Sequence, residues 1–194
     1  SPPLLKNNYI TFGSFNNPSK INENVIMCWA KILENIKNSK LIIKCPSDKQ
    51  QLVRIKKSFE ENFILDSVIF YTSFDDKKDH LNLYKKVDIA LDTFPYNGVT
   101  TSFEAIWMGV PVLTMAGYNF NSRCGESINK NLGTEQLIAK NEKDYVSKAV
   151  DLSRDKEKYI RLRKYIFENA IKSPLFNGKK FTENFFNSLK EIVK

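Results

Sequence analysis

Short apolar runs alternate with longer segments of helical periodicity along most of this 194-residue chain. Runs with the composition of buried strands occupy residues 9–15, 41–43, 67–71, 87–91 and 110–115. Between and after these runs, apolar positions recur every three or four residues, which predicts helices over residues 25–36, 47–63, 76–86, 100–108 and 122–131. Strands that alternate with helices are typical of βαβ units. The sequence therefore predicts an α/β domain in which helices cover both faces of a parallel, Rossmann-like sheet.

The two ends of the chain depart from this alternation. Residues 1–8 contain two prolines and two asparagines, which predicts a linker. Beyond residue 140 the periodicity is purely helical, and the last helix carries an apolar stripe formed by Phe181, Phe185, Leu189 and Ile192. The stripe either packs on its own domain or stays exposed in this chain. We therefore divide the chain into a linker (1–8), an α/β domain (9–175) and a terminal helix (176–194).

The net charge of +8 makes nucleic acid one partner to consider. Only five of the 30 basic residues are arginines, however, and the 25 lysines are spread along the chain instead of gathering in one segment. Proteins that read nucleic acids usually concentrate arginine on one face. The composition therefore favours a solvated basic surface, and we expect no nucleic-acid partner.

The cysteines and the hydropathy of the chain indicate its cellular compartment. Its three cysteines (Cys28, Cys45 and Cys124) are scattered without metal-ligand spacing, which favours a reducing compartment. No run approaches the roughly 18 apolar residues that a membrane span needs, and the chain does not open with a secretory leader. We expect a cytoplasmic protein without a membrane span.

Candidate chemistry lies in the turns that follow the predicted strands, because open parallel sheets bind ligands outside the carboxyl ends of their strands. In residues 91–104 a strand ends, Asn97 and Gly98 form a turn, and Thr100 and Thr101 stand where a helix begins. A helix start favours an anion such as phosphate. The alternative is an ordinary threonine N-cap that binds nothing. Glu104, one turn further on, either accepts hydrogen bonds from a ribose or simply suits the helix dipole.

Two further side chains fall at the same edge of the predicted sheet. Lys20 follows the first strand and could neutralise a diphosphate, although it could equally be one more solvated lysine. His80 is the only histidine and could stack on a base or bond a phosphate, or it could be an ordinary surface residue. There is no glycine-rich phosphate loop, Ser-His-Asp set or carboxylate pair, which argues against a Walker ATPase, a classical dinucleotide site and a triad hydrolase.

Three stretches together resemble one family: residues 10–21, 79–81 and 91–112. They are similar to the carboxy-terminal catalytic half of the O-linked N-acetylglucosaminyltransferase family, which includes the Spindly branch. Residues 122–127, 132–133, 135–139 and 173–176 continue the resemblance in the same order, so that it covers nearly the whole chain.

The resemblance implies a GT-B fold, in which two Rossmann-like halves face a cleft and tetratricopeptide repeats precede them. It implies an inverting enzyme that transfers N-acetylglucosamine or a related sugar from a UDP-sugar to protein Ser/Thr hydroxyls, without a metal or other cofactor. The chain then corresponds to the second half, residues 9–175 bind the nucleotide-sugar, and the terminal helix crosses back to the first half. Its partners are a UDP-sugar, a protein acceptor, the first half and the repeats.

The same resemblance assigns roles to the candidate residues. Lys20 is the catalytic residue that meets the diphosphate and supports the leaving group. Nine positions contact the nucleotide-sugar: Asn17 and Lys20 near the phosphates, Gly98, Thr100 and Thr101 at the helix start, His80 near the uracil or diphosphate, Lys77 and Glu104 at the ribose, and Tyr96 nearer the sugar. Leu83 stands where some relatives carry an arginine, and Asp75 stands where a small residue can occur.

Three alternatives remain open at this stage. A cytosolic protein N-glucosyltransferase shares this half and differs in its acceptor. A nucleotide-binding module without catalysis would keep the same fold, although Lys20 speaks against it. A basic nucleic-acid-binding module would show strongly salt-dependent affinity.

Overall fold

The computed structural model describes residues 2–45, 49–72 and 77–193, with the side chains of Lys49 and Lys77 left out. Six parallel strands form one sheet in the order β3-β2-β1-β4-β5-β6. Their bounds are β1 (Thr11–Ser14), β2 (Lys40–Lys44), β3 (Val68–Tyr71), β4 (Ile89–Leu91), β5 (Val112–Met115) and β6 (Ile138–Ala139). The predicted parallel α/β sheet is confirmed.

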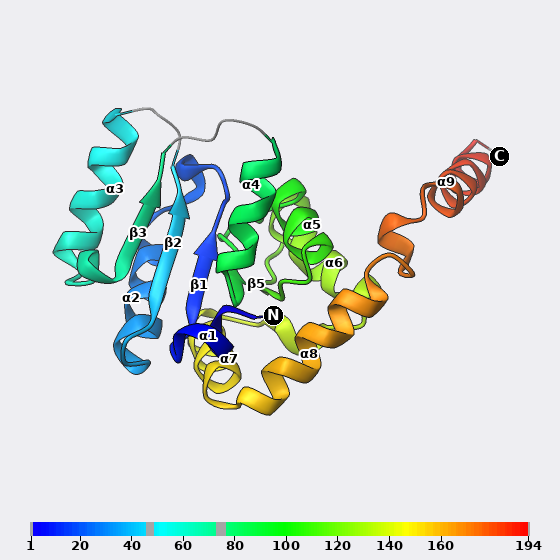
Figure 1. Cartoon of the computed structure of the whole chain (residues 1–194). Coiled ribbons are helices and arrows are strands. Elements are labelled where there is room, and N and C mark those ends of the chain that lie inside the picture. The colour runs from blue at the N-terminus through cyan, green and yellow to red at the C-terminus, as the bar shows by residue number, and fades with distance from the viewer. Residues whose placement is uncertain (1, 46–48, 73–76, 194) are drawn as a thin grey trace.

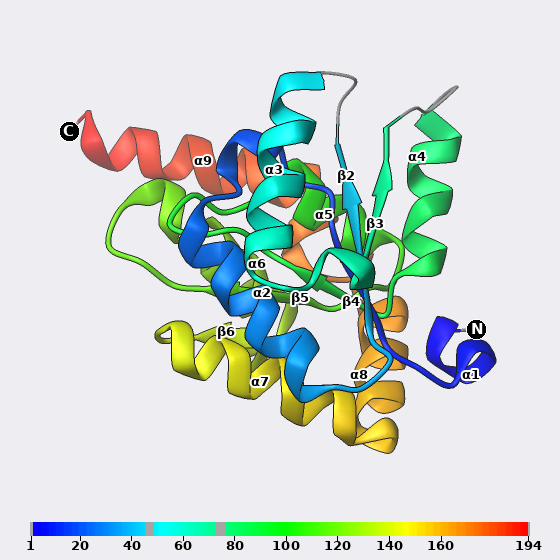
Figure 2. The same cartoon turned by 90° about the vertical axis from the view of Figure 1, so that its left-hand side faces the viewer.

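The helices between and after these strands are α1 (Pro3–Asn7), α2 (Glu23–Asn35), α3 (Lys49–Glu61), α4 (Lys77–Leu83), α5 (Thr100–Trp107), α6 (Cys124–Leu132), α7 (Glu142–Arg154), α8 (Lys156–Asn169) and α9 (Gly178–Ile192) (Figure 1). Asn22 and Asn141 start α2 and α7, because each side chain accepts a hydrogen bond from a backbone N–H of the first turn. Figure 2 shows α2 and α3 on one side of β2 and β3, and α4 on the other. The predicted cover on both faces is therefore present.

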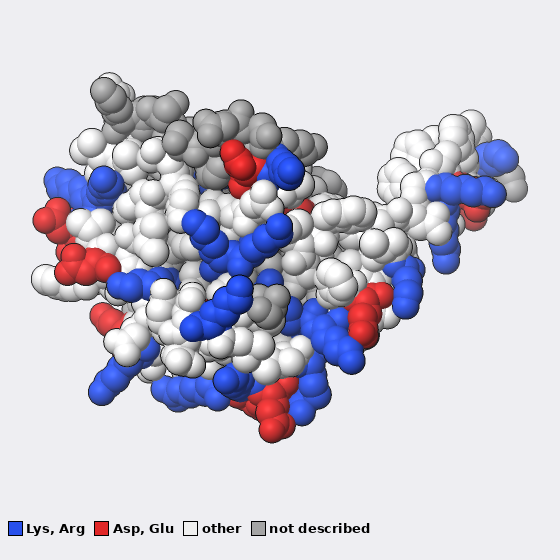
Figure 3. Space-filling model, viewed as in Figure 1, with Lys and Arg blue, Asp and Glu red and all other residues white. Residues whose placement is uncertain are grey.

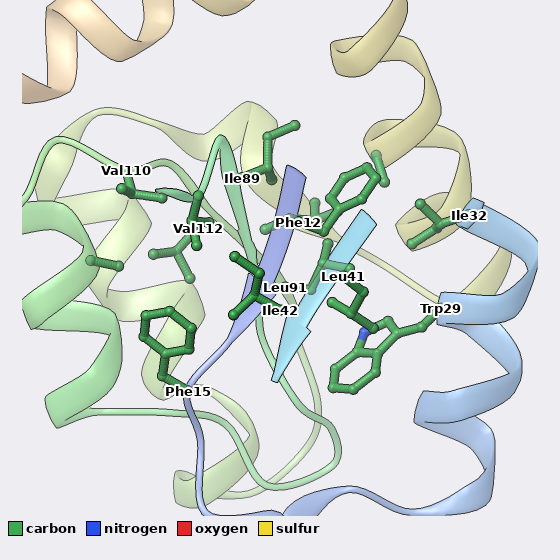
Figure 4. Packing of buried hydrophobic residues seen from close by; sticks show 14 of the residues in the cluster. Phe12, Phe15, Trp29, Ile32, Leu41, Ile42, Ile89, Leu91, Val110 and Val112 are labelled. Carbon is green, nitrogen blue, oxygen red and sulfur yellow. The ribbon is translucent and has the colours of Figure 1, made fainter. Parts of the chain in front are cut away.

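The core lies between the central strands and their helices. Phe12 of β1 pairs with Leu41 of β2 on one side and with Ile89 of β4 on the other, and all three side chains are fully buried. Trp29 of α2 packs beside them (Figure 4), and its indole Nε1 donates a hydrogen bond to the hydroxyl of Tyr145 in α7. The central strands and α2 therefore form a fixed base beneath the turns that follow β1 and β4.

The amino-terminal segment, predicted as a linker over residues 1–8, contains the short helix α1. The buried carboxylate of Asp88 holds this segment, since it accepts hydrogen bonds from the backbone N–H groups of Leu4 and Thr11. It also accepts one from the hydroxyl of Tyr159 in α8. The composition of residues 1–8 gave no sign of this contact, because its partner lies about eighty residues along the chain.

The other differences from the predicted elements are small. β6 was not predicted, because two residues are too few to show a periodicity. The predicted helix over residues 76–86 ends at Leu83, and a 3₁₀ turn (Tyr84–Lys86) leads into the next strand. The predicted starts of two helices, residues 47–48 and 76, lie outside the described residues, as does Asp75.

Helix α9 points away from the sheet in both cartoon views (Figures 1 and 2). None of its described residues is buried, and Phe181 is 67% exposed. Its apolar stripe extends over Phe185, Phe186, Leu189, Ile192 and Val193, all of them exposed. Within this chain the stripe is therefore not packed on its own domain. The boundaries proposed at residues 8 and 175 stay predictions.

We expect the isolated chain to self-associate through residues 181–193 or to hold this helix loosely, because an exposed apolar patch of this kind promotes association. Sedimentation over a range of concentrations, compared with a Phe181→Ser/Phe185→Ser double variant, measures the effect. A monomeric chain whose α9 amides exchange as slowly as those of β1 and β2 would contradict this expectation.

The basic residues lie on several parts of the surface. In the face that Figure 3 shows, Lys and Arg side chains form separate groups with Asp and Glu among them. None of the helices among the described residues combines the length and the apolar character that crossing a bilayer requires.

Candidate functional site

The centre of the sheet contains its topological switch point. β1 and β4 are neighbours, and the chain leaves them toward opposite edges of the sheet, β2 on one side and β5 on the other. Ligands of open parallel sheets bind outside the carboxyl ends of strands at such a point. Two turns meet there: residues 15–22 after β1 and residues 92–99 after β4.

Asp92, the first residue after β4, joins these two turns. Its buried carboxylate accepts hydrogen bonds from the side-chain amide of Asn16 at 3.0 Å and from the backbone N–H of Gly98 at 2.7 Å. It also accepts one from the hydroxyl of Thr114 in β5 at 2.8 Å. Burial raises the pKa of Asp92 to about 6, although these hydrogen bonds act in the opposite direction.

Lys20 crosses from the first turn to the second. Its Nζ donates a hydrogen bond to the backbone carbonyl of Asn97 at 2.9 Å and lies 3.8 Å from the ring centroid of Tyr96, a cation–π distance. Partial burial lowers the pKa of Lys20, and the nearby Asp92 carboxylate partly offsets that effect. Lys20 is therefore half-buried and held in place, and the interpretation as a freely solvated lysine is wrong.

Helix α5 begins at the end of the second turn without a side-chain cap. Its N-cap position is Val99, so Thr100 and Thr101 are the first two helical residues and the interpretation of either threonine as the cap is wrong. The hydroxyl of Thr101 instead donates to Asn16 Oδ1 at 2.6 Å, which ties the helix start to the turn after β1. The first backbone N–H groups of a helix have no partner inside it, so this end of α5 is suited to bind an anion.

His80 and Glu104 form a second cluster beside the start of α5. His80 Nε2 lies 2.8 Å from Glu104 Oε2, and both side chains are largely buried. Tyr84 donates a hydrogen bond to the same carboxylate oxygen at 3.2 Å, and its hydroxyl also lies 3.0 Å from the carbonyl of Thr101. Burial and the neighbouring carboxylate hold the pKa of Tyr84 far above its usual range. His80 is therefore buried beside an acid and is not an ordinary surface histidine.

The remaining predicted residues lie in different surroundings. Asn17 is exposed, and its side-chain oxygen accepts hydrogen bonds from the backbone and hydroxyl of Ser19, so it starts the short 3₁₀ turn Pro18–Lys20. Tyr96 is about half-exposed and Thr100 is exposed. Gly98 is buried, and a Cβ there would collide with Asn16 Oδ1. The side chain of Lys77 lies outside the described residues.

Four residues of this arrangement were not predicted as site residues: Asn16, Tyr84, Asp92 and Asn97. A carboxylate directly after a buried strand is the one sequence signal that could have indicated Asp92. The position that some relatives fill with arginine, Leu83, is buried in the core and does not reach the site. Among the described residues, no three His, Cys, Asp or Glu side chains lie close enough together to hold a metal ion.

The strand order and the two turns at the switch point define a Rossmann-like domain of the kind that forms half of a GT-B glycosyltransferase. Residues 4–185 match the model of glycosyl transferase family 41. The chain therefore belongs to glycosyltransferase family 41.

Curated proteins in plants resemble the chain over almost its whole length. It is 39% identical over 191 residues to a protein of Solanum lycopersicum and 42% identical over 183 residues to one of Hordeum vulgare. Each is named a probable UDP-N-acetylglucosamine–peptide N-acetylglucosaminyltransferase SPINDLY. These matches cover 94% and 93% of the chain but only 20% and 19% of the plant proteins. The chain thus spans about a fifth of these relatives.

Solved structures share the fold. A Thermobaculum terrenum O-GlcNAc transferase mutant, K341M, superposes with a TM-score of 0.84 at 29% identity over 92% of the chain and 35% of that protein. WaaG, a glycosyltransferase of lipopolysaccharide biosynthesis, superposes with a TM-score of 0.66 at 14% identity over 94% of the chain and 49% of that protein, which supports the fold alone.

Proposed function

We propose that this chain is the UDP-sugar-binding half of a longer, inverting glycosyltransferase that transfers N-acetylglucosamine or a related sugar to Ser/Thr hydroxyls of proteins. One observation carries the proposal. Lys20 and the uncapped start of α5 belong to a single hydrogen-bonded unit at the switch point of the sheet. A cation and a row of backbone N–H groups are the two features that bind a diphosphate.

In the proposed mechanism the acceptor attacks one face of the anomeric carbon and the diphosphate leaves from the other. Negative charge then grows on the leaving phosphate, and donors already aimed at that position lower the barrier. The Lys20 ammonium and the N–H groups of Thr100 and Thr101 supply such donors without a metal. Their support for the leaving group is the contribution of this half to catalysis.

The ribose and the base have candidate partners in the second cluster. The Glu104 carboxylate can accept hydrogen bonds from ribose hydroxyls, while His80 and Tyr84 fix its orientation. We propose that the uracil or the diphosphate lies near His80. Position 83 is a buried leucine instead of an arginine, so we propose no side-chain contact with the base at this position.

The rest of the enzyme has to come from outside this chain. The relatives it matches are about five times as long as the chain, and their names specify UDP-N-acetylglucosamine and a peptide. We propose that an amino-terminal Rossmann-like half and tetratricopeptide repeats precede the chain, supply the protein acceptor site and receive α9. A protein N-glucosyltransferase would share every feature described for this half, and the names of the relatives favour the N-acetylglucosaminyltransferase alternative. We place the enzyme in the cytoplasm.

The chain is expected to bind UDP without a divalent metal, because Lys20 and the start of α5 take the place of the cation. Calorimetric titration with UDP in excess chelator measures this binding, and affinity should be weak since half of the cleft is absent. Binding that occurs only after addition of Mg²⁺ or Mn²⁺ would contradict the metal-free mechanism. Equal affinity for duplex DNA, falling steeply with salt, would favour the nucleic-acid alternative.

A further inference from the structure

The Asp92 carboxylate accepts hydrogen bonds from both turns of the candidate site and from β5. Its Oδ1 accepts three: from Asn16 Nδ2 at 3.0 Å, from the backbone N–H of Thr93 at 2.9 Å and from that of Gly98 at 2.7 Å. One oxygen thus holds the turn after β1 and both ends of the turn after β4. Its other oxygen binds Thr114, which belongs to neither turn.

Asn16 extends this connection to helix α5. While its side-chain N–H donates to Asp92, its Oδ1 accepts a hydrogen bond from the hydroxyl of Thr101.

The Asn97 side chain connects the turn after β4 to α6. It donates a hydrogen bond to the carbonyl of Thr93 and accepts one from the backbone N–H of Gly125 in α6. Lys20 in turn donates to the carbonyl of Asn97. Lys20 and the Thr101 hydroxyl are therefore each connected to Asp92 through two hydrogen bonds, Lys20 by way of the Asn97–Gly98 peptide group and Thr101 by way of Asn16.

The packing around this carboxylate leaves it little freedom. A Cβ on Gly98 would collide with Asn16, and one on Gly125 would collide with Thr114 and approach Asp92. Beneath it, Tyr145 donates a hydrogen bond to the backbone carbonyl of Asp92 at 2.8 Å, and Trp29 supports Tyr145. The core thus fixes the position of Asp92 from below while its carboxylate fixes the two turns above.

We propose that Asp92 is a positioning residue, which holds Lys20 and the start of α5 at the spacing that a nucleoside diphosphate needs. This inference rests on the proposed function, and it deepens that function by assigning a role to a residue that does not itself touch the ligand. The charge matters because one neutral carbonyl oxygen holds three short hydrogen bonds poorly, whereas an anionic oxygen strengthens each of them.

The charges around Asp92 allow a positioning role to be distinguished from a purely Coulombic effect on the ligand. The titratable groups that face Asp92 are Lys20 from the turn after β1, Cys124 from α6 and Tyr145 from α7. A carboxylate this close to an anion site repels the ligand, so Coulomb's law alone predicts that removing its charge tightens UDP binding. A positioning role predicts the opposite effect, namely weaker UDP binding, because without the charge the turns after β1 and β4 are held less firmly.

The Asp92→Asn variant tests whether loss of this charge weakens or tightens UDP binding. Its carbonyl can still face Asn16, Thr93 and Gly98, and its amide can donate to the Thr114 hydroxyl, so the fold should survive. Since hydrogen bonds to an ionised acceptor are stronger than neutral ones, we expect UDP affinity at about pH 8 to fall at least about tenfold. The matched control is Thr114→Val, which removes only the donor to the second oxygen and should stay within about twofold of the unchanged chain. Unchanged or tighter UDP binding by Asp92→Asn would overturn the proposal.

Hydrogen exchange of the ligand-free chain separates this result from a failure of the proposed function. In Asp92→Asn the amides of residues 16–21 and 93–101 should exchange faster together, while those of β1 and β2 remain protected. Thr114→Val should leave both turns unchanged. If the unchanged chain binds no UDP yet the two turns still loosen together in Asp92→Asn, the proposed function is wrong and the diphosphate role of Asp92 fails with it, while the coupling of the two turns through Asp92 stands. If the turns exchange as in the unchanged chain, the positioning role is wrong whatever UDP does.

Discussion

Replacing Lys20 with alanine in the longer enzyme is expected to lower turnover by about 100-fold or more, the cost of losing one preorganised transition-state donor. The lysine is held by Asn97 and the ring of Tyr96, so it is already placed before the substrate binds. Since the charge it meets grows as the sugar bond breaks, the loss should fall mainly on kcat. UDP binding should weaken less than turnover does.

Steady-state kinetics with the UDP-sugar and an acceptor protein measure this effect. Lys31→Ala is a matched control, because Lys31 is an exposed lysine on α2 and its removal takes away the same charge. Substitution of an exposed residue usually changes stability by less than about 0.5 kcal/mol, so the control should keep normal turnover. A Lys20→Ala enzyme that also keeps near-normal turnover would mean that Lys20 has no part in catalysis.

Asp92 is expected to make the stability of the chain fall as the pH rises from about 4 to about 7. In the folded chain the pKa of Asp92 is raised by burial to about 6, above the 3.8 of an ordinary aspartate. Between these values the folded state therefore binds more protons than the unfolded state. The stabilisation is complete below the lower value and is lost as the pH passes the higher one. A shift of this size corresponds to about 3 kcal/mol.

Urea unfolding of the unchanged chain and of Asp92→Asn, repeated across this pH range, measures the difference. The free energy of unfolding of the unchanged chain should decline relative to that of Asp92→Asn as the pH rises. Asp66→Asn, which removes an exposed carboxylate from the same domain, should follow the unchanged chain. A difference between the unchanged chain and Asp92→Asn that does not vary with pH, or that grows in the other direction, would refute the assignment. If Asp92→Asn is more stable than the unchanged chain and also binds UDP more weakly, the buried charge of Asp92 supports ligand binding while it destabilises the fold.

The sheet and most of its helices could be predicted from the sequence because their signal is local. The run 41–43 is apolar on both faces, as a central parallel strand must be, and it is the middle of β2. β6 has only two residues and gives no pattern. The short helix α1 depends on a hydrogen bond to Asp88, and a contact over that separation leaves no trace in local composition.

In the candidate site, too, some features have a local signal in the sequence and others depend on contacts between distant segments. The turns could be located from the rule that ligands bind at the carboxyl ends of strands, and Lys20, His80 and Glu104 were named on that basis. That His80 meets Glu104, and that Lys20 meets Tyr96, depends on how segments far apart in the sequence fold together. The roles of Asn16 and Asp92 depend on several simultaneous hydrogen bonds, which only three-dimensional coordinates reveal. Thr101 was interpreted as a possible cap, whereas its hydroxyl binds Asn16.

A crystal structure of this chain with UDP, grown in the presence of chelator, tests the central claim most directly. The account predicts that the diphosphate lies between Lys20 Nζ and the backbone N–H groups of Thr100 and Thr101, with the ribose toward Glu104. The spacing between these groups should change little on binding, because Asp92 and Asn16 already fix it. UDP bound elsewhere on the chain, or phosphates bound through a metal ion at this edge of the sheet, would contradict the account.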